Sequence, residues 1–171
     1  QSETAVHSMV DFFLLLMLAG AGDELQGIKR GIMEMADAIA ITKADGQNEV
    51  AAGGARILYQ NALHLFPSPP SGRKPEVLTC SARENTGINE LWKKIMDYVA
   101  FTKQNGYFEM RRKEQAVIRM DDTINEYLKN TFHTNERVKL MRPKLEQLLY
   151  EGKITSFKAA VSLIDNYLKD S

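Results

Sequence analysis

The chain has 171 residues and a mass of 19.3 kDa, which is enough for one hydrophobic core or for one core with an appendage. Its 22 basic and 22 acidic side chains give a formal net charge of zero, so no global field favours nucleic acid or an anionic membrane as a partner. The single cysteine, Cys80, excludes an internal disulfide framework and indicates a reducing, cytoplasmic location.

The first apolar run of the chain predicts a buried β-strand over 12–18. The run from Phe12 to Ala19 has eight residues, whereas a membrane span needs roughly 20. It also lacks the basic flank and the cleavage site of a signal peptide. A short, continuous apolar run is typical of a central parallel strand, so we expect this strand to be buried on both faces.

Strand and helix signals alternate through the first hundred residues. Asp23 can cap a helix, and Gln26 stands three residues later, as a capping box requires. This alternation predicts an α/β layer in which helices flank a parallel sheet. The other predicted elements are strands over 38–41 and 76–80, a helix over 48–66, and a helix over 87–99 whose core-facing side carries Ile88, Leu91, Trp92 and Ile95.

Strand patterns end near residue 103, and three helices are predicted beyond it. They cover 109–130, 138–150 and 156–169, and either Thr155 or Ser156 can cap the last one. We therefore expect part of an α/β domain over 1–103 and a helical extension over 104–171. The positions predicted to be buried on the first of these helices are Ala116, Ile118, Met120, Ile124, Tyr127 and Leu128.

Ligand loops of a parallel sheet lie at the carboxyl ends of its strands. In this chain the loops that follow the three predicted strands are residues 19–24, 42–46 and 80–87. In the second loop, Asp45 can accept hydrogen bonds from both guanine N1–H and the exocyclic amine, a pair that adenine does not offer. The aliphatic stem of Lys43 can cover the face of the base. The alternative for Thr42-Lys43-Ala44-Asp45 is an ordinary polar turn after a strand.

The other two loops differ in what they offer a nucleotide. Ser81-Ala82 ends the next predicted strand, where GTP-binding proteins place a backbone N–H on guanine O6; the alternative is a simple strand-to-helix turn. The loop from Ala19 to Glu24 is not a phosphate loop, because Gly-x-x-x-x-Gly-Lys-Ser/Thr needs a lysine and a hydroxyl that are absent there.

The sequence shows no residue pattern that favours a metal site or a catalytic cysteine. His7, His64 and His133 share no ligand spacing with Cys80, so we predict no metal site. No histidine is placed in the sequence to activate Cys80 as a nucleophile. We therefore predict that Cys80 is a buried residue at the end of a strand. The basic run of residues 111–113 is typical of a solvated helix face.

Several stretches together resemble one family closely, the GTPase chaperones of methylmalonyl-CoA mutase, also described as lysine/arginine/ornithine (LAO/AO) transport-system ATPases or kinases. The most specific stretch is Asp-Glu-Leu-Gln-Gly-Ile-Lys at 23–29; Gln-Ser-Glu at 1–3, Lys-x-Asp at 43–45, Ser-Ala at 81–82 and Glu-Leu-Trp at 90–92 also match. The resemblance implies a P-loop NTPase-type sheet with a helical dimerisation arm. It also implies GTP/GDP with Mg²⁺ as cofactors, and gating of cobalamin loading and protection of the mutase as the function.

The resemblance also assigns roles to residues. It implies nucleotide binding by Thr42, Lys43, Asp45, Ser81 and Ala82, and a relay of the nucleotide state to the mutase by Asp23, Glu24, Gln26 and Lys29. It leaves the catalytic residues unknown, with Gln1 and Glu3 near the γ-phosphate, and it implies that the helices after residue 104 form a homodimer.

Two departures from the family pattern matter. Thr42 stands where the base-reading motif usually has Asn, which we expect to weaken guanine binding without changing the specificity set by Asp45. The chain starts at Gln1, in the middle of the family pattern, and contains neither a phosphate loop nor the Mg²⁺ ligands. We therefore expect that this polypeptide alone does not hydrolyse GTP at a useful rate. The alternatives are a non-enzymatic dimerisation and partner-docking module and, more weakly, an amino-acid transport-system ATPase.

Overall fold

The computed structural model describes residues 2–19 and 30–169 of the chain. The chain divides into two compact units, one ending at Ala116 and the other beginning at Val117. Within the described residues no helix combines the length and apolar character needed to cross a membrane. The elements are α1 (Ser2–Met9), β1 (Leu14–Leu18), α3 (Arg30–Met35), β2 (Ala38–Thr42), the 3₁₀ turn η1 (Gly46–Asn48), α4 (Glu49–Leu63), β3 (Glu76–Thr79), α5 (Ile88–Gln104), α6 (Tyr107–Thr134), α7 (Glu136–Tyr150) and α8 (Ser156–Leu168).

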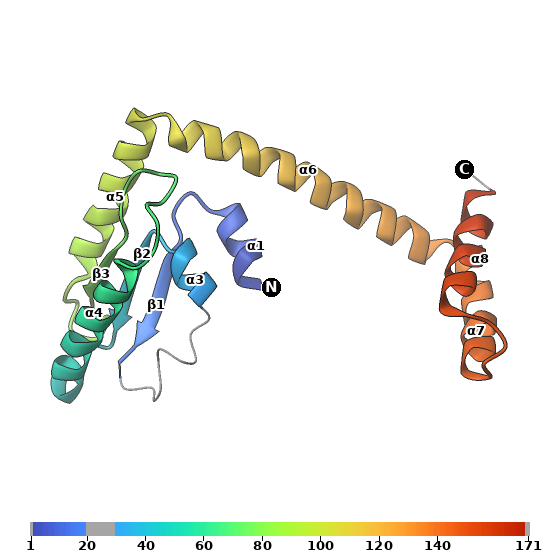
Figure 1. Cartoon of the computed structure of the whole chain (residues 1–171), viewed down its shortest axis with the longest axis horizontal. Coiled ribbons are helices and arrows are strands. Elements are labelled where there is room, and N and C mark those ends of the chain that lie inside the picture. Colours follow the sequence, from blue (N-terminus) through green and yellow to red (C-terminus); the bar gives the residue numbers. More distant parts are fainter. Residues whose placement is uncertain (1, 20–29, 170–171) are drawn as a thin grey trace. The chain divides into compact units, whose positions relative to one another are not determined.

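The first unit contains a three-stranded sheet in the order β1-β2-β3, with both pairs parallel. Leu14 pairs with Ala38 across β1 and β2, and Ala38 pairs with Glu76 across β2 and β3. The parallel sheet with flanking helices confirms the predicted α/β class. In Figure 1 the arrow of β1 is drawn openly, and β2 and β3 follow it toward α5.

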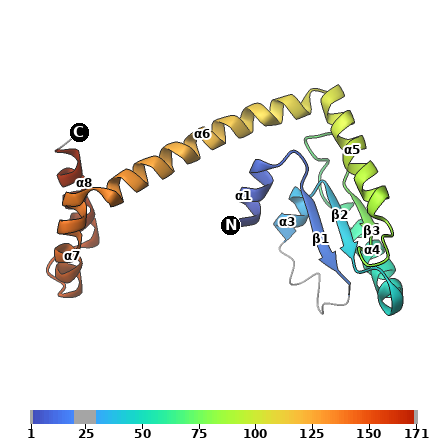
Figure 2. The ribbon, with the colours of Figure 1, turned by 180° about the vertical axis from the view of Figure 1, so that it is seen from behind.

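Both faces of β2 are buried. Ile39 and Ile41 are fully buried in a cluster that also contains Tyr59 of α4. Because strand side chains alternate between faces, Ala40 points the other way, where it packs with Leu78 and Leu91. The sheet is thus covered by α3 and α4 on one face and by α5 on the other, and the view from behind in Figure 2 shows the same elements from the opposite side.

Two sequence predictions about the core are wrong. The apolar run at 12–18 predicts a strand buried on both faces, but Leu16 of β1 is 60% exposed, because the cluster around Leu91 of α5 reaches Leu14 on that face and leaves Leu16 uncovered. Trp92 was expected to face the core and is 62% exposed. Leu91 points at the sheet instead, and adjacent helix positions lie about 100° apart around the axis, so Trp92 turns toward solvent.

The start of α6 is fastened to the end of α1 and to the segment that follows it. Arg111 donates from Nη2 to the carbonyl of His7 at 2.8 Å, which occupies one of the carbonyls left open at the end of α1. Arg112 forms a bidentate ion pair with Asp11, at 2.9 and 2.6 Å. Gln115 donates to the carbonyl of Val10 at 2.9 Å. Three side chains on one face of α6 therefore hold a segment about a hundred positions earlier in the chain.

This junction makes the stability of the first unit depend on pH. Burial and the nearby Arg111 guanidinium lower the pKa of His7 from 6.5, while Asp37 acts in the opposite direction. A lowered histidine pKa means that the unfolded chain binds the proton more readily, so stability is retained above pH 6.5 and is lost as the pH falls below it. We expect His7→Asn to flatten the fall of the thermal midpoint between about pH 7.5 and pH 5.5. An equally steep fall in the variant would contradict this assignment.

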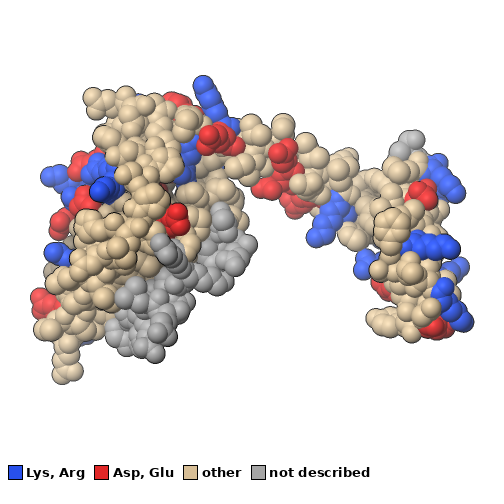
Figure 3. All heavy atoms as spheres, viewed as in Figure 1, with Lys and Arg blue, Asp and Glu red and all other residues tan. Residues whose placement is uncertain are grey.

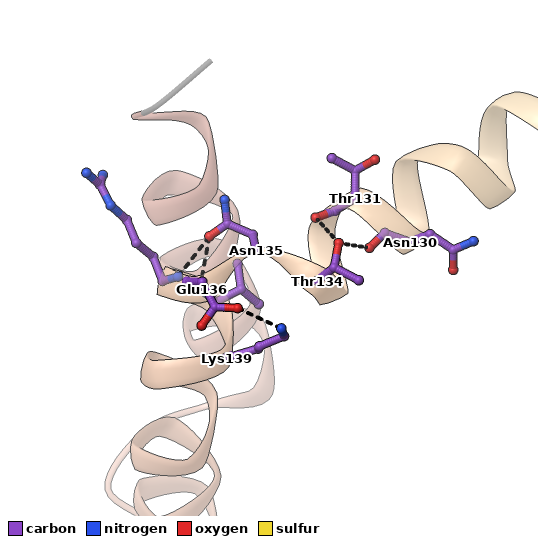
Figure 4. Close-up of polar contacts among 8 residues, drawn as sticks. Asn130, Thr131, Thr134, Asn135, Glu136 and Lys139 are labelled. Atoms are coloured by element: carbon purple, nitrogen blue, oxygen red, sulfur yellow. Dashed lines mark hydrogen bonds and ion pairs between the residues drawn. The ribbon is translucent and has the colours of Figure 1, made fainter.

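In the second unit, α7 and α8 pack against each other, and a polar turn separates α6 from α7. Asn135 caps α7 by accepting hydrogen bonds from the backbone N–H groups of Arg137 and Val138, at 3.0 and 3.2 Å. Figure 4 shows Asn135 between the two helices, with Thr134 bonded back to carbonyls of α6. The cap and the closed last turn of α6 fix where one helix ends and the next begins.

We expect Asn135→Ala to destabilise the second unit by about 1 kcal/mol, because two N–H groups at the start of α7 lose their acceptor. Chemical denaturation followed by circular dichroism measures the change. Asn135→Asp keeps the acceptor and should retain parental stability. Asn130→Ala is a matched control, since Asn130 is exposed and the turn uses only its backbone carbonyl. If Asn135→Ala is as stable as the parent, the cap contributes nothing.

Most of α6 carries exposed apolar side chains, which corrects the sequence prediction for this helix. Its buried residues are Phe108 and Gln115. The positions expected to be buried lie on a surface that the described part of the chain does not cover, and basic and acidic side chains intermingle along the visible face of α6 in Figure 3. The exposed members of the predicted set are Ala116, Ile118, Met120, Ile124, Tyr127 and Leu128.

Candidate functional site

A cavity of about 660 Å³ opens at the carboxyl ends of β2 and β3. This is the edge where ligand loops of parallel sheets gather, and the structure brings the two predicted base-reading loops together there. Of the predicted nucleotide residues, Thr42, Lys43, Asp45 and Ala82 line the cavity, and Ser81 lies buried directly behind Asp45. The remaining lining residues are Leu16, Cys80, Arg83, Ile88 and Leu91.

The two loops are joined by hydrogen bonds. The Ala44 N–H donates to the carbonyl of Cys80 at 3.1 Å, and the Ser81 hydroxyl donates to Oδ2 of Asp45. The Ser81 hydroxyl oxygen in turn accepts the N–H of Glu84 at 3.2 Å. A carboxylate has about four acceptor positions, so Asp45 is oriented by Ser81 and keeps capacity for the two donors that guanine presents.

Thr42 uses its hydroxyl within the protein. The hydroxyl donates to the carbonyl of Met17 in β1 at 3.0 Å, which ties the end of β2 to the neighbouring strand. The Thr42 side chain reaches the cavity wall, but its hydroxyl hydrogen is already donated to the Met17 carbonyl. Thr42 thus helps to position the loop. The motif that this stretch resembles usually has the longer side chain of asparagine at this position.

Positive backbone φ angles occur at both loops. Lys43 has φ of 55° and Gly87 has φ of 72°, in the left-handed region that favours glycine. At position 87 a side chain has no room, since an added Cβ would lie 2.3 Å from the carbonyl oxygen of Thr79. Gly87 therefore lets the chain turn from β3 into α5 while the loop stays against the strand.

The charges around the cavity suit a nucleotide. Lys43 and Arg83 supply positive charge, and Asp45 supplies the acceptor for a base edge. Burial raises the pKa of the Cys80 thiol, which keeps it protonated and unsuited to act as a nucleophile. Arg83 is not among the residues predicted from the sequence to belong to the site, although its position directly after Ser81-Ala82 could have indicated it.

Some predicted site residues lie outside this geometry. Gln1, Asp23, Glu24, Gln26 and Lys29, together with the helix predicted from Asp23, fall outside the described residues. Glu3 belongs to α1, but its side chain is not described. Among the residues that are described, no three His, Cys, Asp or Glu side chains are grouped as metal ligands would be.

The chain is similar to a set of GTPases. A family model described as "Methylmalonyl Co-A mutase-associated GTPase MeaB" matches residues 1–137. GTPase ArgK of Escherichia coli (strain K12) is 43% identical over 136 residues, which make up 80% of this chain and 41% of that protein. The methylmalonic aciduria type A homolog, mitochondrial, of Mus musculus is 37% identical over 164 residues, or 96% of this chain and 40% of that protein.

A solved structure with a similar fold points to the same family. The crystal structure of an LAO/AO transport system kinase matches with a TM-score of 0.70 and 33% identity, covering 96% of this chain and 52% of that one, which supports the predicted P-loop NTPase-type sheet. The chain spans about two fifths of the length of the two curated relatives described above. The match to residues 1–137 and the similarity to named GTPases show that the chain belongs to the MeaB family of methylmalonyl-CoA mutase-associated GTPases.

Proposed function

We propose that this chain carries the guanine-reading site of a protein that binds and hydrolyses GTP with Mg²⁺. The observation that carries the proposal is the Asp45 carboxylate, held by the Ser81 hydroxyl beside a cavity of about 660 Å³. Asp45 binds guanine N1–H and the exocyclic amine, the Lys43 stem covers the base, and the backbone at Ser81 and Ala82 faces guanine O6. Thr42 holds the loop through its bond to β1.

The partner we propose is methylmalonyl-CoA mutase or a related cobalamin-dependent acyl-CoA mutase. The family description and the name of the mouse relative support this choice. In the proposal, Asp23, Glu24, Gln26 and Lys29 relay the nucleotide state to the mutase and so gate cobalamin loading and protection. The single free and buried Cys80 suits the reducing cytoplasm in which we place the protein.

A second candidate is a non-enzymatic module that dimerises and docks a partner. The exposed apolar side chains of the helical extension favour it, because surfaces of this kind on α6 and α8 mark interaction sites. Examples are Tyr127, which is 70% exposed, and Phe157, which is 79% exposed. We propose that residues 104–171 form a homodimer in either case. An amino-acid transport-system ATPase is the weakest candidate, because Asp45 favours guanine over adenine.

One experiment separates these candidates. The chain is immobilised, and binding of cobalamin-free methylmalonyl-CoA mutase is measured with no nucleotide, with GDP and with ADP, alongside GTP turnover by the chain alone. Mutase binding that responds to GDP but not to ADP supports the GTPase. Mutase binding that is insensitive to both nucleotides supports the docking module. An absence of mutase binding in all three conditions would refute the proposed partner. We expect no measurable GTP turnover by the chain alone, because its sequence contains no Gly-x-x-x-x-Gly-Lys-Ser/Thr.

A further inference from the structure

Non-glycine residues with left-handed backbone are concentrated at the candidate site. Among the described residues they are Lys43, with φ of 55°, and Asn85, with φ of 54°. Lys43 belongs to the loop after β2 and Asn85 to the loop after β3. Residues other than glycine rarely adopt this backbone conformation, and those that do are held in it by their surroundings. The structure must therefore contain a contact that keeps Lys43 in place.

Asn48 supplies that contact. It stands at the N-cap position of α4, where asparagine ordinarily accepts a backbone N–H of the first helical turn, yet its side chain makes no such bond. Its Nδ2 instead donates to the carbonyl of Lys43 at 2.8 Å, and its backbone N–H donates to the carbonyl of Asp45 at 3.0 Å. The side chain at the N-cap position of α4 is thus turned back toward the loop over 42–46, which we call the base-reading loop.

The peptide group between Lys43 and Ala44 is consequently bonded at both of its ends. Its carbonyl accepts from Asn48, and its N–H, which belongs to Ala44, donates to the carbonyl of Cys80 at 3.1 Å. A planar peptide held at both ends has a fixed orientation. Asp45 follows directly, so the direction of its carboxylate and of the Lys43 stem depends on this peptide.

We propose that Asn48 is a positioning residue for nucleotide binding: by donating to the Lys43 carbonyl it holds the base-reading loop in its left-handed conformation. This inference rests on the proposed guanine site. Asn48 does not line the cavity, so it acts through Lys43 and Asp45 rather than by contact with the base.

Asn48→Asp separates positioning from helix capping. Aspartate is nearly isosteric with asparagine, is an equally good N-cap residue and is favoured by the helix dipole, but it cannot donate to a carbonyl. We expect the variant to keep or raise the thermal midpoint and to bind GDP about tenfold more weakly, the loss expected for one hydrogen bond. If Asn48 served only to start α4, Asn48→Asp would leave GDP affinity unchanged. Asn61→Ala on the exposed face of α4 is the matched control and should leave affinity unchanged.

A second readout needs no nucleotide. Amide exchange of Ala44 reports its bond to Cys80, and we expect it to be faster in Asn48→Asp than in the parent chain, with exchange at Tyr59 in α4 unchanged. Unchanged exchange at Ala44 would overturn the proposal, as would faster exchange with unaltered GDP affinity. If the parent chain itself fails to bind GDP, the proposed guanine site fails, and Ala44 exchange alone then decides whether Asn48 holds the loop.

Discussion

Alanine at position 87 is expected to destabilise the first unit by about 3 kcal/mol or more. Two costs combine there. The backbone φ of 72° lies in the left-handed region, where any Cβ is strained, and the added Cβ would lie 2.3 Å from the Thr79 carbonyl oxygen and 3.1 Å from Cα of Cys80. Both neighbours are backbone atoms, one in the last residue of β3 and one in the residue directly after it, so relief of the clash must move the end of β3.

Two glycine variants serve as controls for Gly87→Ala. Gly46 also has a positive φ, of 53°, but an added Cβ there meets nothing within 4 Å, so Gly46→Ala should cost about 1 kcal/mol from strain alone. Gly54 lies in α4 with open space around it, and alanine there should stabilise the chain by up to about 1 kcal/mol. Urea denaturation ranks the three variants. A Gly87→Ala protein as stable as Gly46→Ala would show that the close approach to Thr79 is unimportant.

Removal of the Asp45 carboxylate should abolish the preference for guanine over adenine nucleotides. Each hydrogen bond between the carboxylate and a base donor contributes about 1.5–3 kcal/mol when one partner is charged. Loss of both bonds in Asp45→Ala should therefore weaken GDP binding by about a hundredfold or more and leave ADP binding unchanged. Titration of the parent chain and the variant with fluorescent GDP and ADP measures both affinities.

The control for Asp45→Ala is Glu49→Ala. Glu49 is an exposed acid at the start of α4, close in sequence, and it does not line the cavity. Its removal changes the net charge by the same amount, so any loss of GDP affinity from charge alone would appear in this variant too. Equal losses in the two variants would show that Asp45 does not read the base.

The central strand and the two ligand loops could be predicted from the sequence because local signals determine them. The apolar run at 38–41 matches β2 to within one residue, and the polar residues that follow lie at the cavity as parallel-sheet geometry requires. The predicted cap of α8 is confirmed, since the Thr155 hydroxyl accepts the N–H of Lys158. Each of these features depends on residues that are close together in the chain.

The features that were predicted wrongly or missed are set by residues distant in the sequence or by the backbone conformation. Apolar periodicity shows that one face of α6 is apolar, but not whether another element covers it. Trp92 fits the apolar pattern of its helix by type, yet the packing of Leu91 turns it toward solvent. The role of Asn48 depends on the φ angle of Lys43, and no residue pattern indicates a left-handed lysine.

The most direct test of the guanine site is an NMR titration of the ¹⁵N-labelled chain with GDP and, in parallel, with ADP, a method that also detects weak binding. We expect GDP to shift the amide signals of Ala44, Asp45, Ser81 and Ala82, and ADP at the same concentration to leave them in place. Equal shifts with both nucleotides, or no shift at either loop with GDP, would contradict the assignment of this cavity as a guanine site.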